Sequence, residues 1–189
     1  MRVLIVDDES LIRMDLRDII ESSGHEVVAE GTNGVEAIKL CKEYKPDIVL
    51  MDVKMPELDG IEAARQIGFH HEAPVVLLTS YSQQDLVTKA RESGVYGYLI
   101  KPVREEQLIP TLEMACGRFL DDLESRQQMA DLEKTLEERK IIQKATGILM
   151  DLYKITEDES YNRIRQLSMK KRESIVNICK LIIQQASSN

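Results

Sequence analysis

Hydrophobic positions in the first part of the chain form short apolar runs separated by longer amphipathic stretches. The runs predict strands at residues 3–6, 26–29, 48–51, 75–78 and 97–100. Most of these runs are apolar at consecutive positions, which is typical of strands that are buried on both faces. The stretches between them repeat apolar residues at helical spacing and predict helices near 10–22, 33–44, 58–69, 84–93 and 105–120. Five strand–helix units with short connections favour an α/β fold with a five-stranded, doubly wound parallel sheet.

The rest of the chain has only helical patterns, and all five prolines lie before residue 111. Residues 111–153 predict a long helix, with a candidate interruption near Gly117. Apolar residues recur along it at approximately heptad intervals, with one slip, which indicates a short or imperfect coiled coil. These residues are Leu112, Phe119, Leu123, Met129, Leu132 and Leu136.

Two further helices are expected after this stalk. Thr156 followed by Glu157 and Glu159 is typical of a helix N-terminus, and it predicts a helix that ends at about Leu167. A last helix is expected at about 171–186. The expected organisation is therefore an α/β domain at 1–120, a coiled-coil linker at 121–138 and a three-helix domain at 139–189.

The net charge of −8 hides an asymmetry along the chain. Residues 1–123 carry 13 Lys and Arg against 23 Asp and Glu, whereas residues 139–189 carry 10 against 5. An acidic front and a basic tail indicate two functions on one chain. The alternative is a chance fluctuation combined with a solvated helix face.

Cysteine usage and hydropathy indicate the cellular compartment. Cys41, Cys116 and Cys179 are far apart and lack metal-ligand spacing, so we expect free thiols in a reducing environment. No apolar run is long enough to cross a bilayer, and the N-terminus lacks the pattern of a signal peptide. We therefore expect a cytoplasmic protein that does not contact the membrane.

Polar residues follow four of the predicted strands. Asp7 and Asp8 follow the first, Asp52 ends the third, Thr79 follows the fourth and Lys101 follows the fifth. Carboxyl ends of parallel strands meet at one edge of a sheet, so these side chains should converge. Three carboxylates repel each other unless a cation joins them, and such oxygen ligands suit Mg²⁺. Asp52 is then a candidate nucleophile toward phosphorus, whereas any one of these residues alone is more often a cap or turn residue.

The stretches LIVDDE, LMDVKMPELDG, LLTS and GYLIKP, in this order and spacing, resemble the receiver domain of response regulators. The resemblance covers residues 1 to about 120 and implies a flavodoxin-like fold. It implies that Asp52 is the phosphoacceptor and that Mg²⁺ is held by Asp7, Asp8, Asp52 and the backbone carbonyl of Lys54. Such domains take phosphate from a partner histidine kinase, so the resemblance implies a signalling site and no enzyme activity on a separate substrate.

The same resemblance implies roles for residues at the ends of the last two strands. Thr79 and Tyr98 match the switch residues, Lys101 matches the lysine that contacts the phosphoryl group, and the Lys101–Pro102 peptide is commonly cis in this family. Lys54 and Tyr81 each lie two residues past a site residue, where bulk would obstruct an in-line water. Surface packing or solvation is an equal alternative for both.

The basic tail contains a cluster, Lys170, Lys171 and Arg172, that we expect at the start of the last helix. Charge and helix dipole would both favour phosphates there. Tyr153 and Tyr161 are candidates for stacking on an exposed base, and the alternative is a solvated face with two core tyrosines. Composition does not distinguish DNA from RNA.

Residues 136–183, LEERKIIQKATGILMDLYKITEDESYNRIRQLSMKKRESIVNICKLII, resemble the ANTAR output module. Members bind nascent mRNA and favour an antitermination structure of paired hairpins. Cys179 stands where a small residue is usual, and a thiol packs like one. Ala145 and Gly147 match the module but could simply permit close helix packing. The candidate RNA contacts are Arg139, Lys140, Lys144, Arg165, Lys170, Lys171 and Arg172.

The sequence thus predicts a response regulator that pairs upon phosphorylation of Asp52 and binds two-hairpin mRNA leaders, causing antitermination. Regulators of the ethanolamine-utilisation type are a candidate subgroup. One alternative is a DNA-binding response regulator. The predicted helix at 157–167 is short for a DNA-recognition helix, which argues against this alternative. The other is a receiver whose coiled coil binds a protein.

Overall fold

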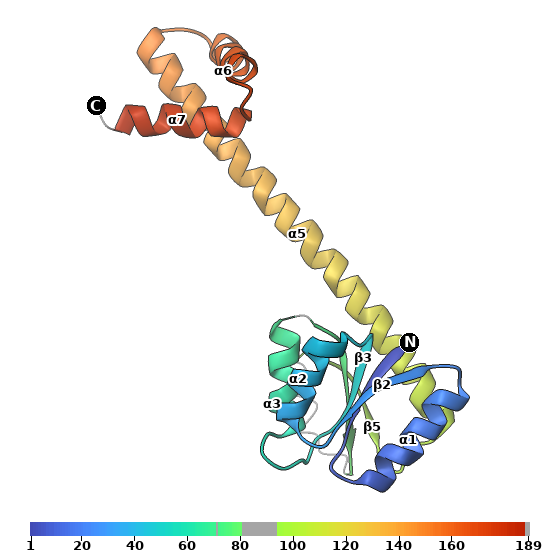
Figure 1. The fold of residues 1–189 in the computed structure, drawn as a ribbon. Coiled ribbons are helices and arrows are strands. Elements are labelled where there is room, and N and C mark those ends of the chain that lie inside the picture. Colours follow the sequence, from blue (N-terminus) through green and yellow to red (C-terminus); the bar gives the residue numbers. More distant parts are fainter. Residues whose placement is uncertain (71, 81–93, 188–189) are drawn as a thin grey trace. The chain divides into compact units, whose positions relative to one another are not determined.

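The computed structural model describes residues 1–70, 72–80 and 94–187 (Figure 1). The chain divides into two compact units, Met1–Leu123 and Glu124–Asn189, and each is considered by itself. Residues 84–93, for which the sequence predicts a helix, lie outside the described residues, as does Tyr81.

The first unit is built on a parallel sheet of five strands in the order β2-β1-β3-β4-β5. The strands are β1 (Arg2–Val6), β2 (Glu26–Gly31), β3 (Ile48–Asp52), β4 (Val75–Thr79) and β5 (Val95–Ile100). Every residue of β3 and β4 is buried, as their uninterrupted apolar sequence predicts. The predicted five-stranded, doubly wound parallel fold is confirmed.

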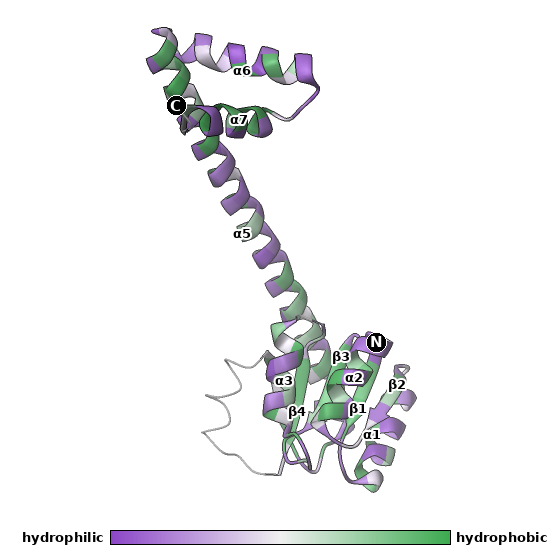
Figure 2. Ribbon diagram, turned by 60° about the vertical axis from the view of Figure 1, so that its left-hand side comes forward, coloured by the Kyte–Doolittle hydropathy of each residue, from purple (hydrophilic) through white to green (hydrophobic). Residues whose placement is uncertain are grey.

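Helices cover both faces of this sheet: α1 (Ser10–Ser22) and the start of α5 (Glu105–Tyr153) on one face, α2 (Gly34–Tyr44) and α3 (Gly60–Phe69) on the other. Alternate residues of each strand enter the two cores: Ile5 and Leu50 pack with α1 and α5, whereas Leu4 and Val49 pack with α2 and α3. Figure 2 shows apolar strands between helices whose outer faces are polar.

Two side-chain caps fix where α2 and α3 begin. The Asn33 side chain accepts from the backbone N–H of Glu36, and the Asp59 side chain accepts from that of Glu62. Each cap satisfies a backbone donor that has no partner within its helix. The α3 cap lies at the end of the loop that follows β3, so it also fixes the position of that loop.

The helices predicted separately at 105–120 and 111–153 are one helix, α5. No interruption occurs at Gly117, which disagrees with the sequence-based interpretation; one glycine lowers helix stability by only about 1 kcal/mol. The heptad interpretation was wrong at its first positions, because Leu112 and Phe119 belong to the first unit. Leu112 is fully buried against the sheet, and Phe119 packs edge-on against Tyr96 with ring centroids 5.3 Å apart.

The second unit contains the end of α5, α6 (Glu157–Lys171) and α7 (Ile175–Ser187) around a small aliphatic core. The buried residues of this core are Ala145, Leu149, Ile164, Ile178 and Cys179. Thr156 and Glu159 form the predicted capping box at the start of α6. However, α6 has 15 residues and continues to Lys171, beyond the predicted end at Leu167. A short helix is therefore no argument against a DNA-binding output.

The basic cluster ends α6 and does not begin the last helix, so that prediction was wrong. Lys170 and Lys171 occupy the last turn, and Arg172 has left-handed backbone conformation (φ 55°). Glu173 N–H donates to the Ser168 carbonyl at 3.1 Å, which closes the helix end. α7 starts after Ser174, whose hydroxyl accepts from Asn177 N–H. The helix dipole therefore favours these cations and does not add to phosphate binding here.

None of the helices in the described ranges is long and apolar enough to span a membrane.

Candidate functional site

The carboxyl ends of β1 and β3 bring three carboxylates together. Asp7, Asp8 and Asp52 each offer an oxygen, and these oxygens all lie within 4.8 Å of one another. Asp7 is fully buried and Asp52 is 5% exposed, whereas Asp8 is exposed. The three carboxylates therefore converge, as predicted from their positions after adjacent parallel strands. The cluster opens to solvent on the Asp8 side.

The Lys101 ammonium joins two of these carboxylates. Its Nζ atom lies 2.7 Å from Asp7 Oδ2 and 2.9 Å from Asp52 Oδ1. Lys101 follows β5, and its backbone N–H donates to the Thr79 carbonyl at 2.8 Å, so pairing with β4 positions it. The Lys101–Pro102 peptide is cis, as the resemblance implied.

Backbone donors orient the carboxylates further. Lys54 N–H donates to Asp52 Oδ2 at 3.1 Å, and Glu9 N–H donates to Asp7 Oδ1 at 3.0 Å. Both oxygens of Asp52 therefore have a donor, one from the Lys101 side chain and one from the following loop. This arrangement fixes the carboxylate orientation at the mouth of the site.

Burial dominates the electrostatics of the pair. Desolvation raises the pKa of Asp52 above its ordinary value, partly opposed by the hydrogen bond and charge of Lys101. Burial alone would lower the pKa of Lys101, but its bonds to Asp7 and Asp52 outweigh this effect and raise the pKa. A cation at this position therefore supports ionised carboxylates in a low-dielectric pocket.

The donor set fits Mg²⁺. The three residues offer hard carboxylate oxygens, and one of them is solvent-exposed, which leaves room for the waters that Mg²⁺ retains. A net excess of two negative charges remains after Lys101 is counted against Asp7, Asp8 and Asp52. Receiver domains bind Mg²⁺ at an acidic pocket, and this cluster has that composition. The predicted contribution of the Lys54 carbonyl stays a prediction.

The predicted switch residues differ in exposure. Thr79 is 8% exposed at the end of β4, beside the Asp52 end of β3 in the sheet register. Tyr98 is 52% exposed on β5. Lys54 is exposed and contacts Asp52 through its backbone, and its predicted shielding role stays a prediction.

Sequence reasoning missed two features that hold the site in place. Arg13 on α1 donates to the Asp7 carbonyl at 2.7 Å and pairs with Glu30 of β2, which ties the β1–α1 loop to the sheet. A Cβ atom at Gly60 would overlap the Asp52 carbonyl oxygen, so a side chain is excluded there. The sequence signal for this contact is the glycine itself, because glycine is common where two backbone segments approach closely.

The predicted RNA contacts all belong to the second unit and are all exposed: Arg139, Lys140, Lys144, Arg165, Lys170, Lys171 and Arg172. Tyr153 and Tyr161 are exposed too, so the core alternative for them is wrong. The Arg163 guanidinium lies 5.2 Å from the Tyr153 ring centroid. A Cβ atom at Gly147 would meet nothing, so close packing does not explain that glycine.

Two family matches cover most of the chain. Residues 3–113 match the response regulator receiver domain, and residues 130–183 match the ANTAR domain. The transcriptional regulatory protein PdtaR of Mycobacterium tuberculosis is 40% identical over 183 residues, which is 97% of this chain and 89% of that protein.

Solved structures resemble the first unit. The receiver domain of a putative response regulator NarL from Mycobacterium tuberculosis has a TM-score of 0.59 and 27% identity, covering 61% of this chain and 95% of that one. A chain of the CheX–CheY–BeF₃–Mg²⁺ complex from Borrelia burgdorferi has a TM-score of 0.55 and 28% identity, and the match covers 59% of this chain and 86% of that one. With the acidic cluster and its lysine in place, the chain belongs to the response regulators that join a receiver domain to an ANTAR domain.

Proposed function

We propose that phosphorylation of Asp52 by a sensor histidine kinase causes two chains to pair and to bind an mRNA leader with two hairpins, which prevents transcription termination. A receiver domain implies a phosphodonor kinase, and an ANTAR domain implies RNA binding. The protein would work in the cytoplasm, where nascent transcripts are made. It would accept phosphate on itself and act on no separate substrate.

The observation that carries the proposal is the position of Asp52 beside Lys101, Asp7 and Asp8. The Lys101 ammonium lies 2.9 Å from one Asp52 oxygen, and the Lys54 N–H holds the other. Burial of Asp52 keeps bulk water from most of the carboxylate, whereas the exposed Asp8 leaves a side open for a phosphodonor.

The bonds that form and break in the transfer step belong to Asp52 and the phosphodonor. An Asp52 carboxylate oxygen forms a bond to the phosphorus of a phosphohistidine, the phosphorus–nitrogen bond breaks, and the imidazole leaves with the electron pair and takes up a proton. In this proposal Lys101 neutralises the oxygens of the transferred group, and Thr79 binds one of them. Asp7, Asp8 and Asp52 would hold Mg²⁺, which would supply further positive charge to the transferred group.

The stalk offers a surface for pairing. Met129, Leu132 and Leu136 are 64%, 61% and 49% exposed on α5. Apolar side chains at these spacings are typical of a coiled-coil seam. Pairing through them would bring two ANTAR domains to one RNA.

A first experiment tests the phosphoacceptor. The protein is incubated with a small-molecule phosphodonor and Mg²⁺, and intact mass reports the added phosphoryl group. We expect Asp52→Asn to abolish the addition and Asp8→Ala to slow it by weakening the metal site. A stable acyl phosphate on the Asp52→Asn protein would contradict the assignment.

A second experiment tests the output against both alternatives. RNA with two hairpins and randomised loops is selected on the phosphorylated protein, and the selected RNA is compared with duplex DNA of matched charge by electrophoretic mobility. We expect RNA to bind and DNA to bind only weakly. Preference for DNA would favour a DNA-binding regulator, and binding of neither would favour a protein-interaction output.

A further inference from the structure

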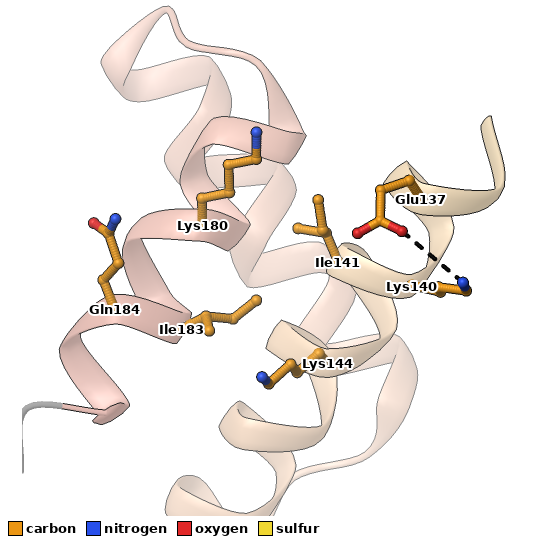
Figure 3. Close-up of a pocket in the computed structure, with 7 residues that line it drawn as sticks. All are labelled: Glu137, Lys140, Ile141, Lys144, Lys180, Ile183 and Gln184. Atoms are coloured by element: carbon orange, nitrogen blue, oxygen red, sulfur yellow. Dashed lines mark ion pairs between the residues drawn. The ribbon is translucent and has the colours of Figure 1, made fainter. Parts of the chain in front are cut away.

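A hollow of about 340 Å³ lies between α5 and α7 in the second unit, outside the acidic site (Figure 3). Its apolar part comes from Ile141 of α5 and Ile183 of α7. Both isoleucines are half-buried and pack against the core of this unit, so their positions are fixed. Figure 3 shows the two side chains extending from their helices toward the same space. The hollow is open to solvent, and its size suits a small organic group that is partly covered.

Charged and polar side chains surround these isoleucines. Lys140, Lys144 and Lys180 supply three positive charges, and Glu137 supplies one negative charge at 3.9 Å from Lys140 Nζ. The rim therefore carries a net charge of +2. These four charged residues are exposed. Gln184, which also lines the hollow, is exposed as well.

An unpaired nucleotide within an RNA chain has the complementary composition. Its base presents an apolar face and hydrogen-bonding edges, and a phosphate flanks it on each side. The two flanking charges match the rim charge of +2, the base face matches the isoleucines, and the base edge can meet Glu137 or Gln184. A duplex, in contrast, presents phosphates on its outer surface and keeps its bases stacked. It therefore has no exposed base face that could contact the two isoleucines.

We propose that this hollow takes one unpaired nucleotide from a hairpin loop of the bound RNA, with the base on Ile141 and Ile183 and the flanking phosphates near Lys144 and Lys180. The inference rests on the proposed RNA-binding function and specifies which part of the second unit contacts the hairpin loop. It adds Lys180 to the cations that sequence reasoning had selected. Sequence-specific recognition of RNA commonly uses such splayed bases.

The test uses the full chain, phosphorylated, with the two-hairpin RNA selected above. Gln184→Trp on α7 fills the hollow from an exposed position, and Gln127→Trp on α5 is the matched control away from the hollow. Lys144→Met combined with Lys180→Met removes the charges but keeps the apolar stems, and Lys134→Met is the control for charge loss. Circular dichroism checks that each variant keeps its helical content.

The RNA is varied in parallel by replacing one loop nucleotide at a time with an abasic site. We expect one abasic position to weaken binding to the wild-type protein by about tenfold, because the apolar area that the base covers on the two isoleucines is then exposed to water. Gln184→Trp should weaken the intact RNA by a similar factor, and the abasic change should then have no further effect. The double lysine variant should weaken binding and flatten its salt dependence, whereas both controls should bind like wild type.

Other outcomes would contradict either this proposal or the proposed RNA-binding function. If the wild-type protein binds the RNA but Gln184→Trp and the double lysine variant bind equally well, the hollow is not the loop site. If the wild-type protein selects no RNA, the proposed function fails and this inference fails with it. Free nucleoside monophosphates form a last arm: if they bind the wild type but not Gln184→Trp, and leave RNA affinity unchanged, the hollow belongs to a soluble nucleotide.

Discussion

Replacing Lys101 with Met removes the ammonium group that pairs with both Asp7 and Asp52 while keeping most of the side-chain volume. Asp7 is fully buried and Asp52 is 5% exposed, so the two carboxylates would face each other in a low-dielectric pocket without compensation. Lys101 Nζ lies within 2.9 Å of both carboxylates, so its loss should also raise the pKa of Asp52 further above its ordinary value.

The magnitude follows from the burial of the pair. Removing one partner of a buried ion pair typically destabilises a protein by about 3–5 kcal/mol. The Lys101 side chain is 13% exposed, so some solvent screening remains and we expect a loss of about 2–4 kcal/mol without metal. This corresponds to opening of the sheet about 30 to 1,000 times more often.

Amide hydrogen exchange of β1 and β3, followed by mass spectrometry in the presence of a chelator, measures this opening within the first unit alone. Arg104→Met removes an exposed cation three residues away and should change exchange little. Adding Asp52→Asn to Lys101→Met should restore most of the protection. If Lys101→Met exchanges like wild type, or if Asp52→Asn does not rescue it, the carboxylates are not held by this cation.

The sign of the pH dependence provides a second check. A carboxyl group whose pKa is raised in the folded state stabilises the fold when it is protonated, and this contribution is lost as pH rises through the folded pKa. Lys101→Met raises that pKa further, so its stability deficit should be small near pH 4 and grow toward pH 8 in the chelator. A deficit that is the same at both pH values would contradict the electrostatic origin.

Three further predictions concern residues outside the ion pair. Gly60→Ala should destabilise the first unit and slow phosphorylation, because the added Cβ would overlap the Asp52 carbonyl oxygen. Amide exchange and the phosphorylation assay measure these two effects, and wild-type values in both would refute the prediction. The Cys41 thiol should resist alkylation at pH 8, because burial, and to a smaller extent the neighbouring Glu72, raises its pKa to about 12. The partly exposed Cys116 should react first, and peptide mass mapping measures the order. Arg172→Gly should stabilise the second unit by about 1 kcal/mol, since an L side chain is strained in the left-handed conformation and glycine is not; thermal unfolding checks the sign.

The acidic site could be predicted from the sequence because it depends on topology alone. Once the apolar runs define parallel strands, residues such as Asp7 and Asp52 must lie at the same edge of the sheet. The Lys101 contacts follow from the same rule, although their distances do not. Arg13 could not be assigned, since its partners are a backbone carbonyl and a residue on another strand.

The helical half was predicted less well because helix ends depend on local backbone detail. The basic cluster at 170–172 continues the pattern of α6 and then stops at a left-handed residue that is not glycine, so no common stop signal marks the end. Leu112 and Phe119 fit a heptad but are buried against the sheet, because apolar periodicity alone does not tell a coiled-coil seam from a helix face that covers a domain core.

The central claim is that phosphorylation of Asp52 makes two ANTAR domains act on one RNA. The most direct measurement titrates the phosphorylated and unphosphorylated protein against RNAs that carry one or two of the selected hairpins. The account predicts that the phosphorylated protein prefers two hairpins over one by about 10²–10⁴-fold through effective concentration, and that changing Leu132 and Leu136 to Gln removes this preference. Equal affinity for one and two hairpins, unchanged by phosphorylation, would contradict it.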